Sequence, residues 1–168
     1  MQEVQEEPIK LTYLDFKILN EKWSTYKVED GTILKARVMM VSYAKVTNPK
    51  PNQANFMFAL HTVFGVESPN EIRGPADSTT YTSSELMNAL EPGKEDLKID
   101  TLQELWSEYV VEDTTRVSLK VTPTRIMRTK KYDFAGNPQY VVQSIIVPKV
   151  VGKDPKKLAA MVGFGPTG

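Results

Sequence analysis

The chain has 168 residues, of which 40% are apolar and 25% are charged, a composition typical of one globular domain and not of a disordered chain. Twenty-one basic residues balance 21 acidic ones, so the formal net charge of zero excludes a protein that holds nucleic acid or acidic lipid by bulk charge alone. The lack of cysteine excludes disulfides, a cysteine nucleophile and thiolate metal sites, and the single histidine, His61, excludes multi-histidine metal centres and disfavours histidine-centred hydrolysis.

Residues 1–9 are predicted to be an acidic N-terminal arm, since they lack both the basic start and the apolar centre of a signal peptide. No apolar run in the chain approaches the roughly 18–20 residues that span a bilayer. We therefore expect a cytoplasmic protein that does not insert into membranes.

A first unit, residues 13–66, is predicted to consist mainly of three strands. Its strongest signal is Asp30-Gly31, which stands between two strand-like runs and predicts a hairpin. A strand and a short helical turn are expected before this hairpin. A turn rich in Asn and Pro at 48–52 precedes the third strand at 56–66.

The linker, residues 67–96, contains the best helix signal in the chain. Residues 82–91 resemble a capped helix, which begins at Thr82 and is stopped by Pro92-Gly93. Before it, residues 74–80 are predicted to be a loop.

A second unit, residues 97–150, repeats the same order. Residues 101–109 have apolar side chains at helical spacing, so a short helical turn is expected there. Thr114 replaces the glycine of the first hairpin, and because a β-branched residue resists positive φ, this turn is expected to be longer or of another type. Pro123 is expected to end a strand or lie on an edge, and a third strand is expected at 140–147.

Sliding the sequence against itself by 83 residues shows that the two units are related. Residues 19–30 and 102–113 share eight identities in twelve positions, and both tryptophans of the chain are among them. The matched pairs include four aromatic residues that we expect to be core anchors: Trp23, Tyr26, Trp106 and Tyr109. We interpret the chain as an internal duplication of one β unit.

Three strands leave edges and an apolar face uncovered, and two related units can cover them for each other. The predicted fold is therefore mainly β: a pseudo-twofold, six-stranded barrel or sandwich within a single domain. Two small tandem domains are the alternative.

The run Trp-x-x-Tyr-x-x-Glu-Asp-Gly-Thr-x-Leu-Lys of the first unit, with Gly136-Asn-Pro-x-Tyr140 of the second, resembles small uncharacterised prokaryotic β proteins. The second unit departs from this motif at Thr114, Arg116 and Ser118. The resemblance covers the repeats, implies a β fold and carries no activity.

Few residues suggest chemistry. The pairs Glu29-Asp30 and Glu112-Asp113 could serve acid–base chemistry or a cation, but their places in the hairpins favour a structural role. His61 lies in an apolar strand without an accompanying nucleophile motif, and the glycine-rich end 163–168 lacks the Lys-Ser/Thr of a phosphate loop. No catalytic residue, metal site or cofactor is predicted.

Charge is unevenly distributed along the chain. Residues 1–100 hold 11 basic and 15 acidic residues, and residues 101–168 hold 10 basic and 6 acidic ones. A possible nucleic-acid face combines basic and aromatic side chains, namely Arg116, Lys120, Arg125, Arg128, Lys130, Lys131, Tyr132 and Phe134.

The C-terminal tail, residues 151–168, follows a basic stretch with apolar residues that suit assembly contacts: Leu158, Met161, Val162 and Phe164. The duplication, the contrasting ends and the charge split favour a non-enzymatic structural protein that forms a homo-oligomer or a larger ordered assembly with itself or with protein partners. The alternative is a nucleic-acid-binding β-barrel that uses the basic 116–134 face.

Overall fold

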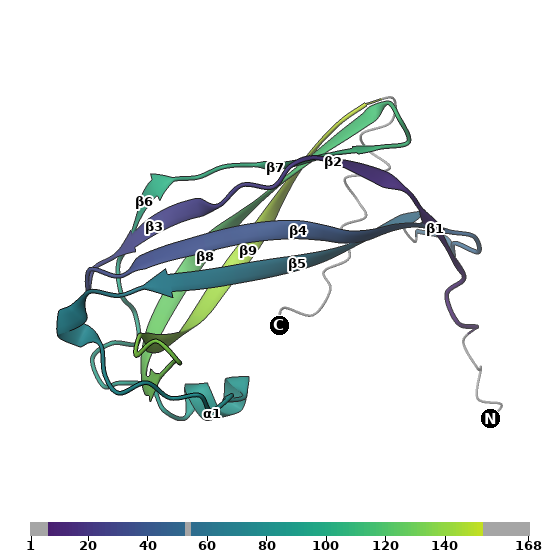
Figure 1. Ribbon diagram of the computed structural model, residues 1–168. Helices are drawn as coiled ribbons and strands as arrows, with labels where there is room; N and C mark the ends of the chain where they lie inside the picture. The colour runs from purple at the N-terminus through teal and green to yellow at the C-terminus, as the bar shows by residue number, and fades with distance from the viewer. Residues whose placement is uncertain (1–6, 53–54, 153–168) are drawn as a thin grey trace, which may run out of the picture.

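The computed structural model describes residues 7–52 and 55–152, which form two antiparallel β-sheets and one short α-helix (Figure 1). The mainly β class expected from the sequence is confirmed. The inward side chains of both sheets form one hydrophobic core.

The first sheet is organised around its longest strand, β4 (Ile33–Val46). β5 (Phe56–Glu67) pairs with almost the whole length of one side of β4. The other side is shared by β3 (Ser24–Val28), which pairs with the start of β4, and by β1 (Leu11–Leu14), which pairs with its end. β6 (Ile99–Gln103) lies on the outer side of β3.

The second sheet has the order β2-β7-β8-β9. Its members are β2 (Phe16–Asn20), β7 (Ser107–Val111), β8 (Thr115–Tyr132) and β9 (Pro138–Val151). β8 and β9 form a long hairpin that crosses behind β4 and β5 in Figure 1. Each sheet therefore ends in a long outer strand, β5 in the first and β9 in the second.

Each sheet also contains a strand from the other half of the chain. β2 precedes β3 in sequence but pairs with β7, and β6 precedes β7 but pairs with β3. Adding 83 to the bounds of β2 and β3 gives the bounds of β6 and β7. Register shifts interrupt β4 between Met40 and Ser42 and β8 between Pro123 and Arg125, again 83 residues apart. Neither half of the chain thus builds either sheet alone.

Two buried tyrosines connect the halves at the centre of the core. The hydroxyl of Tyr26 donates a hydrogen bond to Glu104 Oε2 at 2.6 Å, and that of Tyr109 donates to Glu21 Oε1 at 2.7 Å. Both tyrosines are fully buried, so these bonds satisfy hydroxyl groups that would otherwise be costly to bury.

The tryptophans differ from their expected role as core anchors. Trp23 is 38% exposed, and its ring lies 4.7 Å from the guanidinium carbon of Arg37. Trp106 is partly buried and packs in the same way against Lys120 Nζ at 4.7 Å. Each indole has a large apolar surface that a cationic side chain covers at the protein surface.

The sheets do not close into a barrel, because β5 and β9 are not paired with each other within the described residues. Residues 101–109 contain no helical turn: they belong to β6, an irregular break and β7. Strand pairing outweighs their helical spacing, because β6 bonds its backbone to β3 and β7 bonds its backbone to β8. The expectation of three main strands in each unit is also wrong, because these segments add strands to the sheets.

The helix predicted at 82–91 is present but shorter, as α1 (Ser83–Met87). Thr82 caps it by accepting a hydrogen bond from the backbone of Glu85 at 3.2 Å. The chain then turns to run along the edge of β8 opposite β9, beyond the segment that β7 covers, where Lys130 N donates to Ala89 O at 2.8 Å. The uncovered side of β8 competes for these residues and ends the helix early. A 3₁₀ turn, η1 (Asn70–Ile72), lies earlier in the linker.

The two hairpin turns differ in type: residues 29–32 separate β3 from β4, and residues 112–114 separate β7 from β8. In the first, Gly31 N donates to Val28 O at 2.9 Å, and Gly31 has a φ of 90°. In the second, Glu112 and Asp113 have φ values of 52° and 58°, while Thr114 avoids positive φ. The expected change of turn type is confirmed, and the turn is not longer.

Pro123 lies within β8 at the register shift, opposite Ser144 of β9 and past the end of the segment that β7 covers. This is the edge position expected for a residue without an N–H group. Within the described residues, neither helix is long and apolar enough to cross a bilayer.

Candidate functional site

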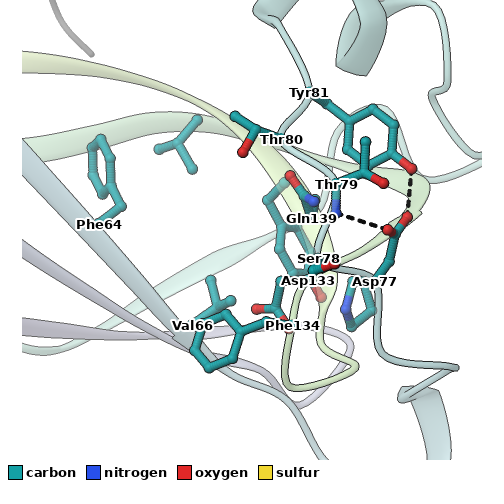
Figure 2. A pocket seen from close by; sticks show the side chains of 13 residues that line it. Phe64, Val66, Asp77, Ser78, Thr79, Thr80, Tyr81, Asp133, Phe134 and Gln139 are labelled. Carbon is teal, nitrogen blue, oxygen red and sulfur yellow. Dashed lines mark hydrogen bonds between the residues drawn. The ribbon is translucent and has the colours of Figure 1, made fainter.

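Two adjoining cavities lie between the outer strands β5 and β9, with volumes of about 690 Å³ and 380 Å³. They share the residues Phe64, Tyr81, Tyr140 and Val142, so they form one continuous depression, called here the β5–β9 groove. Figure 2 shows its smaller part, where the loop before α1 approaches the start of β9.

The edges of the two strands, and not only their faces, border the groove. Residues 61–64 of β5 and 140–144 of β9 line the larger cavity in unbroken runs. Successive side chains of a strand point to opposite faces, so an unbroken run of lining residues means that the strand presents its edge. Among the described residues, β5 pairs only with β4 and β9 only with β8. The backbone groups on these two edges are therefore available to another strand.

Charge is distributed over the strands in an unusual way. β5 and β9 carry one formal charge each, Glu67 and Lys149, both near the C-terminal ends of their strands. The inner strands carry more charged residues: β4 has three basic residues and β8 has six. Edge strands are ordinarily kept apart from other chains by charges, by proline or by being very short. β5 and β9 have 12 and 14 residues, so they rely neither on charge nor on shortness, although Pro138 and Pro148 lie in β9.

The walls of the groove are apolar and incompletely covered. Phe64 and Val66 of β5, together with Tyr140 and Val142 of β9, pack against the core but are only partly buried. Further along β9, Ile145 is 54% exposed. An apolar surface of this kind favours a ligand that excludes water from it.

One buried hydroxyl in the wall has no partner. Thr62 is 5% exposed, lines the larger cavity, and its Oγ1 makes no hydrogen bond within the described residues. A buried polar atom without a partner is rare and costly, so it marks a place where a ligand atom would be favoured.

The narrow end of the groove is held by two aspartates. Asp77 accepts hydrogen bonds from the hydroxyl of Tyr81 and, at 2.9 Å, from the backbone of Thr79 (Figure 2). These bonds, the one from Tyr81 first, lower the pKa of Asp77 below its ordinary value. Asp133 accepts from the backbone of Ala135 and Asn137, both at 2.9 Å. Both carboxylates fix turns, and they also place negative charge at this end.

Behind the groove, Tyr140 joins a buried polar network. Its hydroxyl donates to Asp30 Oδ2 at 2.6 Å, and Arg128 Nη1 lies 3.2 Å from the same oxygen. Arg128 is also bound to Glu91, with Nε 2.7 Å from Oε2. Burial alone would raise the pKa of Asp30, but hydrogen bonds from Tyr140, Thr32 and Arg128 outweigh burial and lower it. Asp30 therefore stays ionised and fixes the ring of Tyr140 in the groove wall.

This network removes Arg128 from the predicted nucleic-acid face. Arg128 is only 9% exposed and points into the ion pairs described above, because inward positions on β8 face the first sheet. Lys120 is 3.0 Å from Glu104, and Lys131 lies 5.0 Å from the ring centre of Tyr81. The exposed members are Arg116, Arg125, Lys130 and Phe134, and Tyr132 is partly buried.

The two Glu-Asp pairs do not form one site. Asp30 contacts Arg128 and Tyr140 near the start of β4. Glu112 lies near the end of β4, where burial and then the charge of Glu112 raise the pKa of Tyr43. Ten residues of an extended strand separate these ends by about 33 Å. His61 lines the groove beside Thr62. The described residues contain no group of three or more His, Asp or Glu arranged to hold a metal ion.

The predicted assembly residues Leu158, Met161, Val162 and Phe164 lie outside the described residues. The groove itself was not predicted: the sequence analysis singled out His61, Phe134 and Tyr140 of its lining, but each for a different reason. The contrast between β5 and β9, with one charge each, and the more highly charged β4 and β8 is visible in the sequence, but its meaning depends on knowing which strands are outermost.

Comparison with known proteins returned no matching family model, no matching curated protein and no matching solved structure.

Proposed function

We propose that this protein is a non-enzymatic structural protein that assembles with further copies of itself. The observation that carries the proposal is the open side of the molecule, where the two long outer strands β5 and β9 are almost uncharged and border one apolar groove. Such edges pair readily with another chain, so a monomer that kept them exposed would be prone to unspecific association. A defined assembly gives the same surface a specific partner.

We also infer that the two halves are copies of one β unit. Support comes from the eight identities at an offset of 83, from strand bounds with the same offset, and from the reciprocal bonds of Tyr26 and Tyr109. The halves differ in charge, which is net −4 for residues 1–100 and net +4 for residues 101–168. A charge difference of this kind orients the contact between two copies.

The nucleic-acid alternative has less support. Arg128, Lys120 and Lys131 are engaged by neighbours, so the exposed cations that remain are too few for a continuous basic path. Backbone-tracking proteins need such a path beside stacking rings.

The proposal is tested by measuring the mass of the full chain in solution by size-exclusion chromatography with light scattering. We expect a homo-oligomer at micromolar concentration, and a shift toward monomer for Ile145→Lys, which places a charge on the β9 edge. The matched control is Val41→Lys, an exposed apolar position (61%) on the inner strand β4, which should leave the mass unchanged. A full chain that stays monomeric up to high concentration contradicts the proposal.

A further inference from the structure

We propose that the β5–β9 groove binds the C-terminal segment of a second copy of this chain, residues 156–164, in an extended conformation. This inference rests on the proposed assembly function and names its contact. Copies would then join with the tail of one in the groove of the next.

The groove suits an extended peptide better than a compact ligand. Two unpaired strand edges border it, and an added strand would pair its backbone with them. The half-covered side chains of Phe64, Val66 and Val142 provide apolar contacts along its length. Thr62 Oγ1, buried and without a partner, would gain a hydrogen bond from the peptide backbone.

The sequence of the C-terminal segment matches this surface. From residue 158 to residue 168 it contains no charged residue, and its large side chains are Leu158, Met161, Val162 and Phe164. Lys156 and Lys157 directly precede this apolar part. The segment therefore has a basic start and an apolar continuation.

Charge sets the direction of the bound segment. Asp77 and Asp133 lie at the end of the groove where β9 begins, whereas Lys149 lies near the end of β9. Opposite charges attract, so Lys156 and Lys157 are favoured beside the two aspartates, and the apolar residues then run along the groove, parallel to β9.

A chain cannot place its own lysines in this position. From Val151 back to Pro138, β9 spans 13 residues, or about 43 Å. Lys156 follows Val151 by five residues, which reach at most about 18 Å. The lysines that meet Asp77 and Asp133 therefore come from another copy.

The test uses three full-length variants. Leu158→Asp/Val162→Asp disables the tail and leaves the groove intact, and Val142→Lys disables the groove and leaves the tail intact. Thr62→Val keeps the shape of the wall and removes only the unpaired hydroxyl, so it guards against a failure of Val142→Lys to fold. Mass is measured by light scattering, folding by circular dichroism, and a fluorescent peptide of residues 153–168 reports binding to the tail variant by anisotropy.

We expect the tail and groove variants to be monomeric alone and to form a complex of two chains when mixed in equal amounts. Thr62→Val should remain folded and, when combined with the tail substitutions, bind the peptide about three- to tenfold more weakly than the tail variant does, as expected for one lost hydrogen bond. If the tail variant assembles like the unmodified chain, the tail contact is wrong while the proposed assembly stands. If the unmodified chain is monomeric, the inference is overturned whether or not the peptide binds, because the proposed contact joins two copies of the chain.

Discussion

Asp30 illustrates how a residue typical of a turn becomes part of the interior. Its hairpin position was explained by turn preference alone, but its side chain is 4% exposed and accepts hydrogen bonds from Tyr140 and Thr32. Arg128 neutralises it and is in turn held by Glu91. The equivalent residue of the second hairpin, Asp113, is exposed. Only one of the two hairpin turns is therefore connected to the wall of the groove.

This difference predicts how the protein responds to acid. The pKa of Asp30 lies below its usual 3.8 in the folded state, so ionised Asp30 stabilises the fold above that pH, and the stabilisation is lost as the pH falls through the lowered pKa. Asp30→Asn should lower the free energy of unfolding by about 2 kcal/mol at pH 7 and flatten its dependence on pH below 4.

Urea unfolding between pH 2 and pH 7 measures this effect. Asp113→Asn is the matched control, and because it alters an exposed turn with positive φ that asparagine tolerates, it should change stability by less than about 0.5 kcal/mol. Equal losses in both variants would show that the network around Asp30 contributes nothing specific.

At the scale of elements, both hairpin turns need a backbone with positive φ, and they place it at different residues. Gly31 has a φ of 90°, and a Cβ at this position would lie 3.2 Å from Pro69 Cγ. In the second turn the left-handed conformation moves to Glu112 and Asp113, which lets Thr114 occupy the place of the glycine.

Gly31→Ala should therefore destabilise the protein by about 1–2 kcal/mol, through the positive φ and the contact with Pro69. Gly65→Ala is a suitable control, because Gly65 lies in β5 at ordinary φ and its nearest contact would be 4.0 Å away. Equilibrium unfolding in urea measures both variants. A Gly31→Ala protein as stable as the unmodified chain would contradict the role assigned to this turn.

Local signals predicted these elements well where the chain itself supplies the cause. The Asp30-Gly31 turn, the cap at Thr82 and the altered second turn follow from the conformational preferences of single residues. Predictions failed where pairing with a segment distant in sequence determines the secondary structure. Residues 101–109 have helical spacing but pair as strands with β3 and β8, and residues 88–91 leave the helix to run along β8. The groove was missed for the same reason, since no local pattern tells which strands are outermost.

At the scale of the whole molecule, the exchange of β2 and β6 is the feature with the widest consequences. Each of these strands forms the outer part of the sheet that the other half supplies, and the bonds from Tyr26 to Glu104 and from Tyr109 to Glu21 cross between the halves. The hydroxyl groups of both buried tyrosines thus find their hydrogen-bond partners in the other half. The alternative of two tandem domains predicts halves that fold separately, whereas the exchanged strands predict halves that fold only together.

Separating the halves distinguishes these alternatives. When residues 1–75 and 76–168 are expressed as two chains, we expect neither to show a cooperative unfolding transition alone, because each lacks a strand and half of the shared core. Co-expression should restore a complex with the circular dichroism of the intact chain. A folded chain cut at a protease site inserted into the 74–80 loop serves as the control, and it should stay together in size-exclusion chromatography. A sharp transition for either half alone would mean that the strand exchange is dispensable, and that the two halves are able to fold as separate domains.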